Sequence, residues 1–180
     1  IALLVTFFCL LLGYPLGFLM ATTTPFWATM GFIFVLLPLW TSVLVRTYAW
    51  MVLLGRNGVF NRMLMEAGIT SDPIPLLHNF TGVLIGMVHV LLPYMVLPIY
   101  GAVRKVDPAI PAAAAGLGAS SFAIFRRIYL PQTLPGIAAG SLLVFILAVG
   151  YYITPALVGG ADGQLISNLI SFHMSKSNWS

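Results

Sequence analysis

Side chains that carry out chemistry are sparse in this chain, and their spacing builds no enzyme site. The 180 residues include 8 Lys and Arg, 4 Asp and Glu and 3 His. His78, His89 and His173 lack the spacing of metal ligands. Lys105 and Lys176, the two lysines, stand outside any Gly-x-x-x-x-Gly-Lys sequence, which cradles phosphates. We therefore predict that the chain is not an enzyme, has no catalytic residues, and binds no metal or other cofactor itself.

Half of the basic residues lie in one segment, Ala102–Gln132, which separates two long apolar runs. A loop that only reverses the chain between two helices needs a few residues, and this one has about thirty. The basic residues are not interleaved with aromatics on a polar face, so nucleic acid is not an expected partner. The segment is instead expected to contact something outside the membrane. Its basic residues are Arg104, Lys105, Arg126 and Arg127.

The elements that position this segment are membrane helices. The chain is 60% hydrophobic and 7% charged, with a mean hydropathy of +1.01, whereas soluble domains carry about 25% charged residues. About 20 apolar residues cross a bilayer. We predict an all-α transmembrane chain forming one domain over residues 1–180, expected to be truncated at both ends. The four expected spans are Ile1–Ala21, Thr29–Leu54, Phe80–Gly101 and Leu134–Ile153.

The segments between the spans carry weaker signals. Asn61–Gly68 is expected to form a short surface helix, Thr154–Gln164 a Pro/Gly turn, and Leu165–Met174 a short amphipathic helix. The positive-inside rule places Ala102–Gln132 in the cytoplasm and Gly55–Asn79 outside. Glycines four residues apart permit close helix approach and are expected to be packing sites: Gly13 and Gly17, Gly82 and Gly86, and Gly136 and Gly140.

The segment 102–132 has the parts of a helix–turn–helix, which we call the elbow. Ala109–Leu117 is rich in alanine and predicts a short helix. Asp107 is the expected N-cap and Pro108 the first helical residue. Gly118 can take the left-handed conformation that ends such a helix.

A second short helix is expected after Gly118 and ends near Leu130, where Pro131 breaks the backbone hydrogen bonding. Ser120 or Ser121 is its expected cap. Two interpretations follow. The elbow is either an interfacial helix resting in the lipid headgroups or a coupling element that docks into a soluble partner. Its expected aromatic face consists of Phe122, Phe125 and Tyr129, with Arg126 and Arg127 to the side.

The spacing within the elbow resembles the "EAA" loop of binding-protein-dependent ABC importer permeases. That family pattern reads Glu-Ala-Ala, three residues, Gly, nine residues, then Ile-x-Leu-Pro. Ala112 stands where the family has glutamate, which affects the expected contact of that position with the ATPase. The matching positions are Ala113, Ala114, Gly118, Ile128, Leu130 and Pro131.

The resemblance implies a fold, a location and a set of partners. The fold would be the MetI-like helical bundle of type I importer permeases, in the bacterial inner (plasma) membrane. The partners would be ABC ATPase subunits that bind ATP and magnesium, a second homologous permease subunit, and a periplasmic or lipid-anchored substrate-binding protein, besides membrane lipid. The residues expected to couple to the ATPase are Ala112, Ala113, Ala114, Gly118, Ser120, Phe122, Phe125, Arg126, Ile128, Leu130 and Pro131.

The resemblance extends along the chain to the spermidine/putrescine branch of this family. It is carried by Arg46-Thr47-Tyr48-Ala49-Trp50, by the run LPYMVLPIY from Leu92 to Tyr100, and by Gly159-Gly160. Branches for iron(III), sulfate, phosphonate or opines share much of this and are the alternatives. A secondary transporter or channel fragment, or a purely structural bundle, is less favoured. The spans hold only Arg46 and His89 for an ionisable relay, and a structural bundle leaves the elbow unexplained.

Several residues are candidates for the substrate path, each with an alternative. Aromatic rings attract polycations by cation–π interaction, but Tyr and Trp near helix ends also anchor proteins in membrane interfaces. Arg46 either faces the bundle interior or snorkels to the headgroups. His89 is expected to bond a neighbouring helix. The path candidates are Arg46, Tyr48, Trp50, Tyr94, Tyr151, Tyr152 and Asp162, of which Asp162 is alternatively a solvated loop charge.

Overall fold

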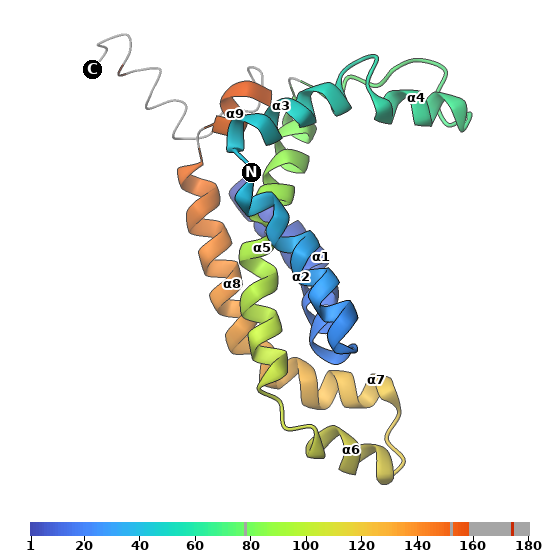
Figure 1. The fold of residues 1–180 in the computed structure, drawn as a ribbon, viewed down its shortest axis with the longest axis vertical. Helices are drawn as coiled ribbons and strands as arrows, with labels where there is room; N and C mark the ends of the chain where they lie inside the picture. Colours follow the sequence, from blue (N-terminus) through green and yellow to red (C-terminus); the bar gives the residue numbers. More distant parts are fainter. Residues whose placement is uncertain (78, 152, 159–173, 175–180) are drawn as a thin grey trace. The chain divides into compact units, whose positions relative to one another are not determined.

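The computed structural model describes residues 1–77, 79–151, 153–158 and 174. Every regular element in this part of the chain is helical, in agreement with the predicted all-α class. Figure 1 shows the helices along the chain. They are α1 (Ala2–Thr22), α2 (Pro25–Trp40), α3 (Val43–Leu54), α4 (Val59–Glu66), α5 (Phe80–Arg104), α6 (Ala109–Gly116), α7 (Ser121–Ile124), the π-helical η1 (Phe125–Tyr129), α8 (Leu130–Gly150) and α9 (Ile153–Val158).

Three helices are long and apolar enough to cross a membrane. They are α1 with 21 residues, α5 with 25, and a continuous helix of 30 residues, Ser121–Gly150, that joins α7, η1 and α8. These confirm the first, third and fourth predicted spans. The short helix predicted over Asn61–Gly68 is also confirmed, as α4.

The second predicted span, Thr29–Leu54, is wrong as one continuous helix because the chain breaks between α2 and α3. Pro38 lacks a backbone N–H, which weakens the last turn of α2, and side chains after it bond carbonyls at the helix end. The Thr41 hydroxyl donates to the Pro38 carbonyl at 2.9 Å, and Arg46 Nη2 donates to the Thr41 carbonyl at 3.0 Å. There is a fourth span only if Pro25–Trp40 and Val43–Glu66, the two halves of a bent pair of helices, are counted together.

The predicted turn at Thr154–Gln164 is corrected in its first part, because α9 makes residues 153–158 helical. The rest of that segment lies outside the described residues. The same holds for the predicted helix Leu165–Met174, apart from Met174.

The chain divides into two compact units. The first, which we call the elbow unit, comprises Thr6–Leu37 and Leu91–Val144 and therefore contains the elbow. The second, which we call the polar unit, comprises Ile1–Val5, Pro38–Val90 and Phe145–Ser180.

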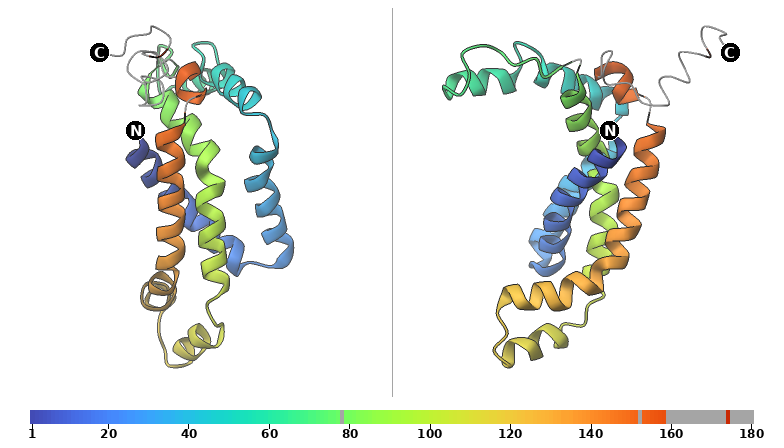
Figure 2. Two further views of the ribbon diagram at one scale, coloured as in Figure 1. Left: turned by 90° about the vertical axis from the view of Figure 1, so that its left-hand side faces the viewer. Right: turned by 180° about the vertical axis from the view of Figure 1, so that it is seen from behind.

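Within the elbow unit, α1 and α8 approach α5 closely at glycines. A Cβ built on Gly17 of α1 would lie 3.1 Å from Ile99 Cγ2, and one built on Gly136 of α8 would lie 2.5 Å from Ala102 Cβ. Gly13 and Gly140 likewise approach Met95. The predicted packing role of the pairs in α1 and α8 is therefore confirmed, and Figure 2 shows α5 and α8 running alongside each other.

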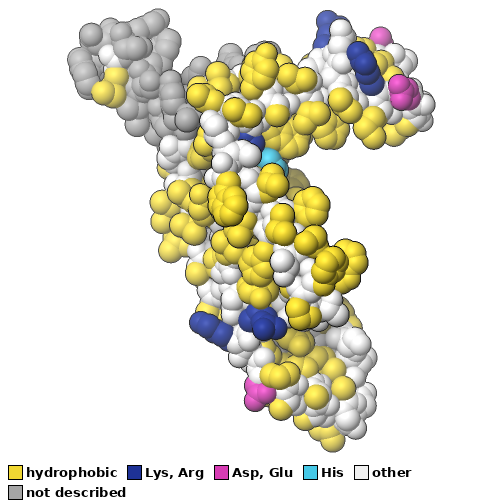
Figure 3. Space-filling view, in the orientation of Figure 1, with side chains coloured by type: hydrophobic (Ala, Val, Ile, Leu, Met, Phe, Trp, Pro, Cys, Tyr) yellow, Lys and Arg dark blue, Asp and Glu magenta, His cyan; other side chains and the backbone are white. Residues whose placement is uncertain are grey.

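A small apolar core joins α1, α2 and α5 in the same unit. Met20, Val35 and Val96 are buried together, and the ring of Phe32 packs edge-on against Tyr100 with 4.6 Å between ring centroids. Hydrophobic side chains dominate the visible face of the helices, and positive charge gathers near the lower end of α5 and near α4 (Figure 3).

Candidate functional site

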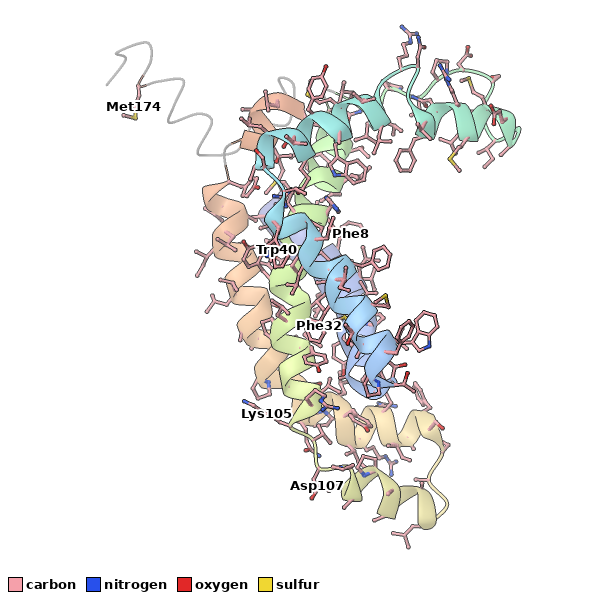
Figure 4. All side chains as sticks on the ribbon, viewed as in Figure 1. Phe8, Phe32, Trp40, Lys105, Asp107 and Met174 are labelled. Atoms are coloured by element: carbon pink, nitrogen blue, oxygen red, sulfur yellow. The ribbon has the colours of Figure 1, made fainter. Side chains whose placement is uncertain are left out.

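The elbow begins where α5 ends, and its first helix is capped from the preceding segment. Figure 4 shows Lys105 and Asp107 between α5 and α6. The residue directly before α6 is Pro108, one position later than predicted. Asp107 still accepts a hydrogen bond on Oδ1 from the Ala109 N–H at 2.9 Å, so its carboxylate serves the first turn as expected.

The turn between the two elbow helices is made by Gly118. Its φ of +83° is in the left-handed region, which confirms the prediction, and a Cβ there would meet nothing within 4 Å. The Ala119 N–H donates back to the Ala114 carbonyl at 3.0 Å, a bond typical of a glycine-ended helix. The glycine is therefore required by backbone conformation and not by lack of space.

The second elbow helix starts after Ser120, which resolves the choice between the two serines. Ser120 Oγ accepts a hydrogen bond from the Ala123 N–H at 3.3 Å. Helices α6 and α7 lie side by side in every view (Figures 1 and 2). The predicted helix–turn–helix is therefore present.

The predicted end of this helix near Leu130 is wrong. The helix continues into α8 through one π-helical turn, in which the Leu130 N–H donates to the carbonyl of Phe125, five residues earlier. Pro131 cannot donate and would clash with a carbonyl in a regular α-helical register. A π turn changes that register locally, as helices do at functional sites and kinks. Figure 1 shows the chain changing direction between α7 and α8 without leaving the helical form.

The inner side of the elbow is held to α1 by four rings, which we call the aromatic clamp: Tyr14, Phe18, Phe125 and Tyr129. Phe18 packs edge-on against Phe125 at 5.5 Å and against Tyr129 at 5.1 Å between centroids. Tyr14 packs edge-on against Phe125 at 5.8 Å. Edge-to-face pairs at these distances contribute about 0.5–1.5 kcal/mol each beyond area burial.

A part-buried hydroxyl pair adds to the clamp. Tyr14 Oη lies 3.0 Å from Thr133 Oγ1, and Thr133 is fully buried. The Thr133 hydroxyl also lies within hydrogen-bond distance of the Tyr129 and Leu130 carbonyls, at 2.9 and 3.1 Å. The Thr133 hydroxyl therefore bonds both the backbone at the π turn and the Tyr14 side chain of α1.

The residues predicted to couple to an ATPase divide into an outer and an inner set. Phe122 is 70% exposed and does not share the inner position of Phe125, so the predicted common aromatic face is wrong. Phe122 lies in the first turn of α7, ahead of the rings that pack against α1. The exposed coupling candidates are Ala112, Ala113, Gly118, Ser120, Phe122, Arg126 and Pro131, and the half-buried ones are Ala114, Phe125, Ile128 and Leu130.

Arg46 is the most buried charged side chain among the described residues, at 8% exposed. Its Nη2 bonds the Thr41 carbonyl, and Nε and Nη1 are enclosed without a hydrogen-bond partner. This burial argues against snorkelling. The next residue, Thr47, pairs its hydroxyl with that of Thr154 in α9 at 3.3 Å.

Trp50 and His89 form a second contact of the polar unit. Trp50 Nε1 donates to His89 Nδ1 at 3.1 Å, which confirms that His89 bonds a neighbouring helix. The Trp50 ring is also stacked on Phe60 at 6.2 Å between centroids. Its ring is therefore engaged by the chain itself, whereas Tyr48 is 67% exposed.

The other path candidates are distributed over both units of the chain. Tyr151 belongs to the polar unit, as do Tyr48 and Trp50, and Tyr94 belongs to the elbow unit. Tyr152 and Asp162 lie outside the described residues.

Sequence reasoning missed Asn61 and the α1 half of the clamp. Asn61 is fully buried; its Nδ2 donates to the Gly55 and Ile74 carbonyls at 3.1 and 3.0 Å, and its Oδ1 accepts from the Ile74 N–H at 2.9 Å. It holds the segment before α4 to the segment after it. For the clamp, the available signal was Tyr14, a polar ring inside an apolar span, with Phe18 four residues later.

Comparison with known proteins places these features in a family. The profile described as "Binding-protein-dependent transport system inner membrane component" matches residues 3–179. The chain is 43% identical over 175 residues to the spermidine/putrescine transport system permease protein PotB of Haemophilus influenzae, covering 97% of this chain and 61% of that protein. PotB of Escherichia coli strain K12 is 38% identical over 169 residues, covering 94% and 62%. The chain thus spans about three fifths of the length of these relatives.

A more distant relative and a solved structure extend the comparison. The molybdenum transport system permease protein ModB of Mycobacterium bovis is 31% identical over 147 residues, covering 82% of this chain and 54% of that protein. A crystal structure of a bacterial ABC transporter involved in the import of the acidic polysaccharide alginate matches with a TM-score of 0.72 and 21% identity, covering 99% of this chain and 67% of that one. The MetI-like fold and the inner-membrane location predicted from the sequence are confirmed. This chain therefore belongs to the family of binding-protein-dependent transport system inner membrane components.

Proposed function

We propose that this chain forms part of the membrane path of an ATP-driven importer, and that its elbow docks on a separate ATPase subunit. The observation that carries the proposal is the elbow itself, a capped helix–turn–helix at Gly118 with an exposed outer face and a continuous helical connection into α8. A short helix exposed between two spans offers a partner a rigid contact.

The proposed assembly contains two ATPase subunits, a second homologous permease subunit and a substrate-binding protein outside the membrane. ATP and magnesium bind the ATPase subunits and not this chain. ATP binding would favour one of two arrangements of the spans because its affinity differs between them. The elbow would pass that preference to α8, to which it is joined by unbroken helix.

The proposed substrate is a polyamine such as spermidine or putrescine. Support comes from the two PotB relatives, which carry this substrate class in their names. Of the aromatic path candidates in the polar unit, Tyr48 is the best placed for cation–π attraction, because it is exposed while Trp50 is engaged by His89 and Phe60. The alternative is another solute, favoured by the molybdenum transport relative.

The test is uptake by the complete transporter in liposomes. The full-length permease is reconstituted with its ATPase, second permease and binding protein, and the uptake of labelled spermidine, putrescine, molybdate and sulfate is measured with and without ATP. We expect ATP-dependent polyamine uptake. Uptake by the permease alone would overturn the transporter class, and uptake of molybdate or sulfate in place of polyamine would overturn the substrate.

The elbow assignment has a test of its own at Gly118. Replacing Gly118 by Val forces a branched side chain into the left-handed region, while the open space around it leaves packing unaffected. We expect normal insertion and assembly, with ATP hydrolysis no longer linked to transport. Gly116→Ala is the matched control, because nothing lies within 4 Å of that position either and its φ is not positive. Unchanged transport by Gly118→Val would contradict the coupling role.

A further inference from the structure

We propose that the aromatic clamp passes the elbow's movement directly to α1, so that α1 and the elbow move as one body. The inference rests on the proposed function, and it assigns positioning roles to Tyr14, Phe18 and Thr133. These residues lie outside the elbow or at its exit, and chain continuity alone would pass a movement of the elbow only to α5 and α8.

The first argument is the geometry of the rings. Phe18 is central, with Phe125 and Tyr129 both edge-on to it and Tyr14 stacked beside it at 6.4 Å between centroids. The contacts join residues more than 100 positions apart in the sequence. Edge-on aromatic pairs are stabilised beyond their area burial, so separating them costs more than separating aliphatic contacts of the same area.

The second argument is the hydrogen bond between Tyr14 and Thr133. It is part-buried, and it ends on the turn that follows η1, where the chain changes direction. Because Thr133 also serves the Tyr129 and Leu130 carbonyls, a movement of the π turn displaces the hydroxyl that Tyr14 holds. Breaking the bond would take this partner from the half-buried Tyr14 hydroxyl.

The third argument is the division of the elbow's aromatic residues. Phe122 points outward and is 70% exposed, whereas Phe125 and Tyr129 are turned to α1. The elbow therefore has an outer surface for its partner and an inner surface that grips a span. The close approaches of Gly13 and Gly17 to α5 then carry the displacement of α1 onward.

The experiment measures whether α1 and the elbow stay together. Spin labels are placed at Leu19→Cys in α1 and Leu117→Cys at the elbow turn, both exposed positions of the elbow unit. The full-length permease carries Cys9→Ser and no other cysteine, and it is studied in the assembled transporter. The label-to-label distance is recorded without nucleotide and with ATP bound to a hydrolysis-deficient ATPase.

The clamp variant is Phe18→Leu, which keeps an apolar side chain and removes three ring contacts. The matched control is Phe32→Leu, which removes the Phe32–Tyr100 contact in the same unit without touching the elbow. A second variant, Tyr14→Phe with Thr133→Val, removes the hydroxyl pair and keeps both side-chain volumes.

We expect one narrow distance in both nucleotide states for the unmodified chain and for Phe32→Leu. For Phe18→Leu the distance should broaden and change with nucleotide, and the ATP consumed per solute transported should rise about threefold to tenfold, the size expected for losing an aromatic pair. Tyr14→Phe with Thr133→Val should change the label-to-label distance and the ATP consumed per solute in the same direction as Phe18→Leu, but by a smaller amount.

Two results would overturn the inference. One is a distance that changes with nucleotide in the unmodified chain. The other is a Phe18→Leu transporter with unmodified distance and coupling ratio. Absence of ATP-dependent uptake by the unmodified complex would instead overturn the proposed function, so the two failures are distinguishable.

Discussion

The two units of this chain are stabilised by different kinds of interaction. Of the five buried polar side chains in the described residues, four lie in the polar unit: Arg46, Thr47, Asn61 and Thr154. The fifth, Thr133, is in the elbow unit, where packing otherwise depends on glycine approaches and aromatic rings.

The difference follows from what each unit has to stabilise. The polar unit contains a broken span and a long connection, so many backbone groups lack helical partners and need side chains to satisfy them. The elbow unit contains long helices whose backbone groups are already paired. Its helices associate through small residues and shape, as membrane helices do. Four substitutions test this contrast.

The largest effect is expected for Asn61→Ala in the polar unit. It removes three buried hydrogen bonds to Gly55 and Ile74, at a cost of roughly 3 kcal/mol in the local free energy of unfolding. Hydrogen exchange of residues 55–77 should accelerate accordingly. The control is Asn57→Ala, since Asn57 is exposed, and equal protection in both variants would contradict the role of Asn61.

The next effect is expected in the elbow unit for Gly136→Ala. The added Cβ would lie 2.5 Å from Ala102 Cβ and 2.7 Å from the Pro98 carbonyl oxygen, so α8 must move away from α5 at a cost of about 1–3 kcal/mol. Thermal unfolding in detergent should show a lower Tm. Gly101→Ala, with nothing within 4 Å of its Cβ, should leave the Tm unchanged or raise it. A Tm for Gly136→Ala as high as that of the control would show that the helices are not in close contact.

A smaller effect of opposite sign is expected for Arg46→Met. It loses one hydrogen bond to Thr41 but removes two enclosed donors that have no partner, and replacing a buried charge by an apolar side chain is often stabilising. We expect a gain of about 1 kcal/mol in the free energy of unfolding, measured by denaturation in detergent. Arg56→Met, at an exposed position of the same unit, should change nothing. A clear loss of stability in Arg46→Met would indicate that Nε and Nη1 are satisfied in the assembled protein.

The smallest effect is expected for Tyr14→Phe. Thr133 keeps its bonds to the Tyr129 and Leu130 carbonyls, so the loss is limited to one hydroxyl pair and amounts to about 0.5–1 kcal/mol. The same denaturation assay measures it, with Tyr100→Phe as the aromatic control. If both variants unfold alike, the Tyr14–Thr133 bond contributes nothing measurable.

Much of the fold was predictable because its signals are local. Apolar length predicts α1, α5 and most of α8, and the glycine at position 118 predicts a left-handed turn that the structure contains. The capping roles of Asp107 and Ser120 also depend on neighbouring residues only. The spacing of the elbow residues, which resembles the family pattern, also predicts the MetI-like fold.

The other features of the fold were not predictable from local signals, because they depend on interactions with side chains elsewhere in the chain. Pro131 predicts a helix end, but the π turn and the Thr133 hydroxyl let the helix continue. Pro38 gives the same signal and the helix does break nearby, where Thr41 and Arg46 bond the Pro38 and Thr41 carbonyls. The partners of Tyr14, Phe18 and Asn61 lie on other segments, and no periodicity within one segment identifies them.

The π turn also makes the number of residues in η1 a structural requirement. A turn of this kind holds one residue more than an α-helical turn, and each residue of an α-helix accounts for about 100° of rotation around its axis. Deleting Arg127, which belongs neither to the clamp nor to the expected coupling residues, would rotate Phe125 by about 100° relative to α8 and point it away from Phe18. The family's fixed count of residues between Gly118 and Ile128 can therefore be understood as a constraint on rotation, which residue-by-residue similarity alone does not express.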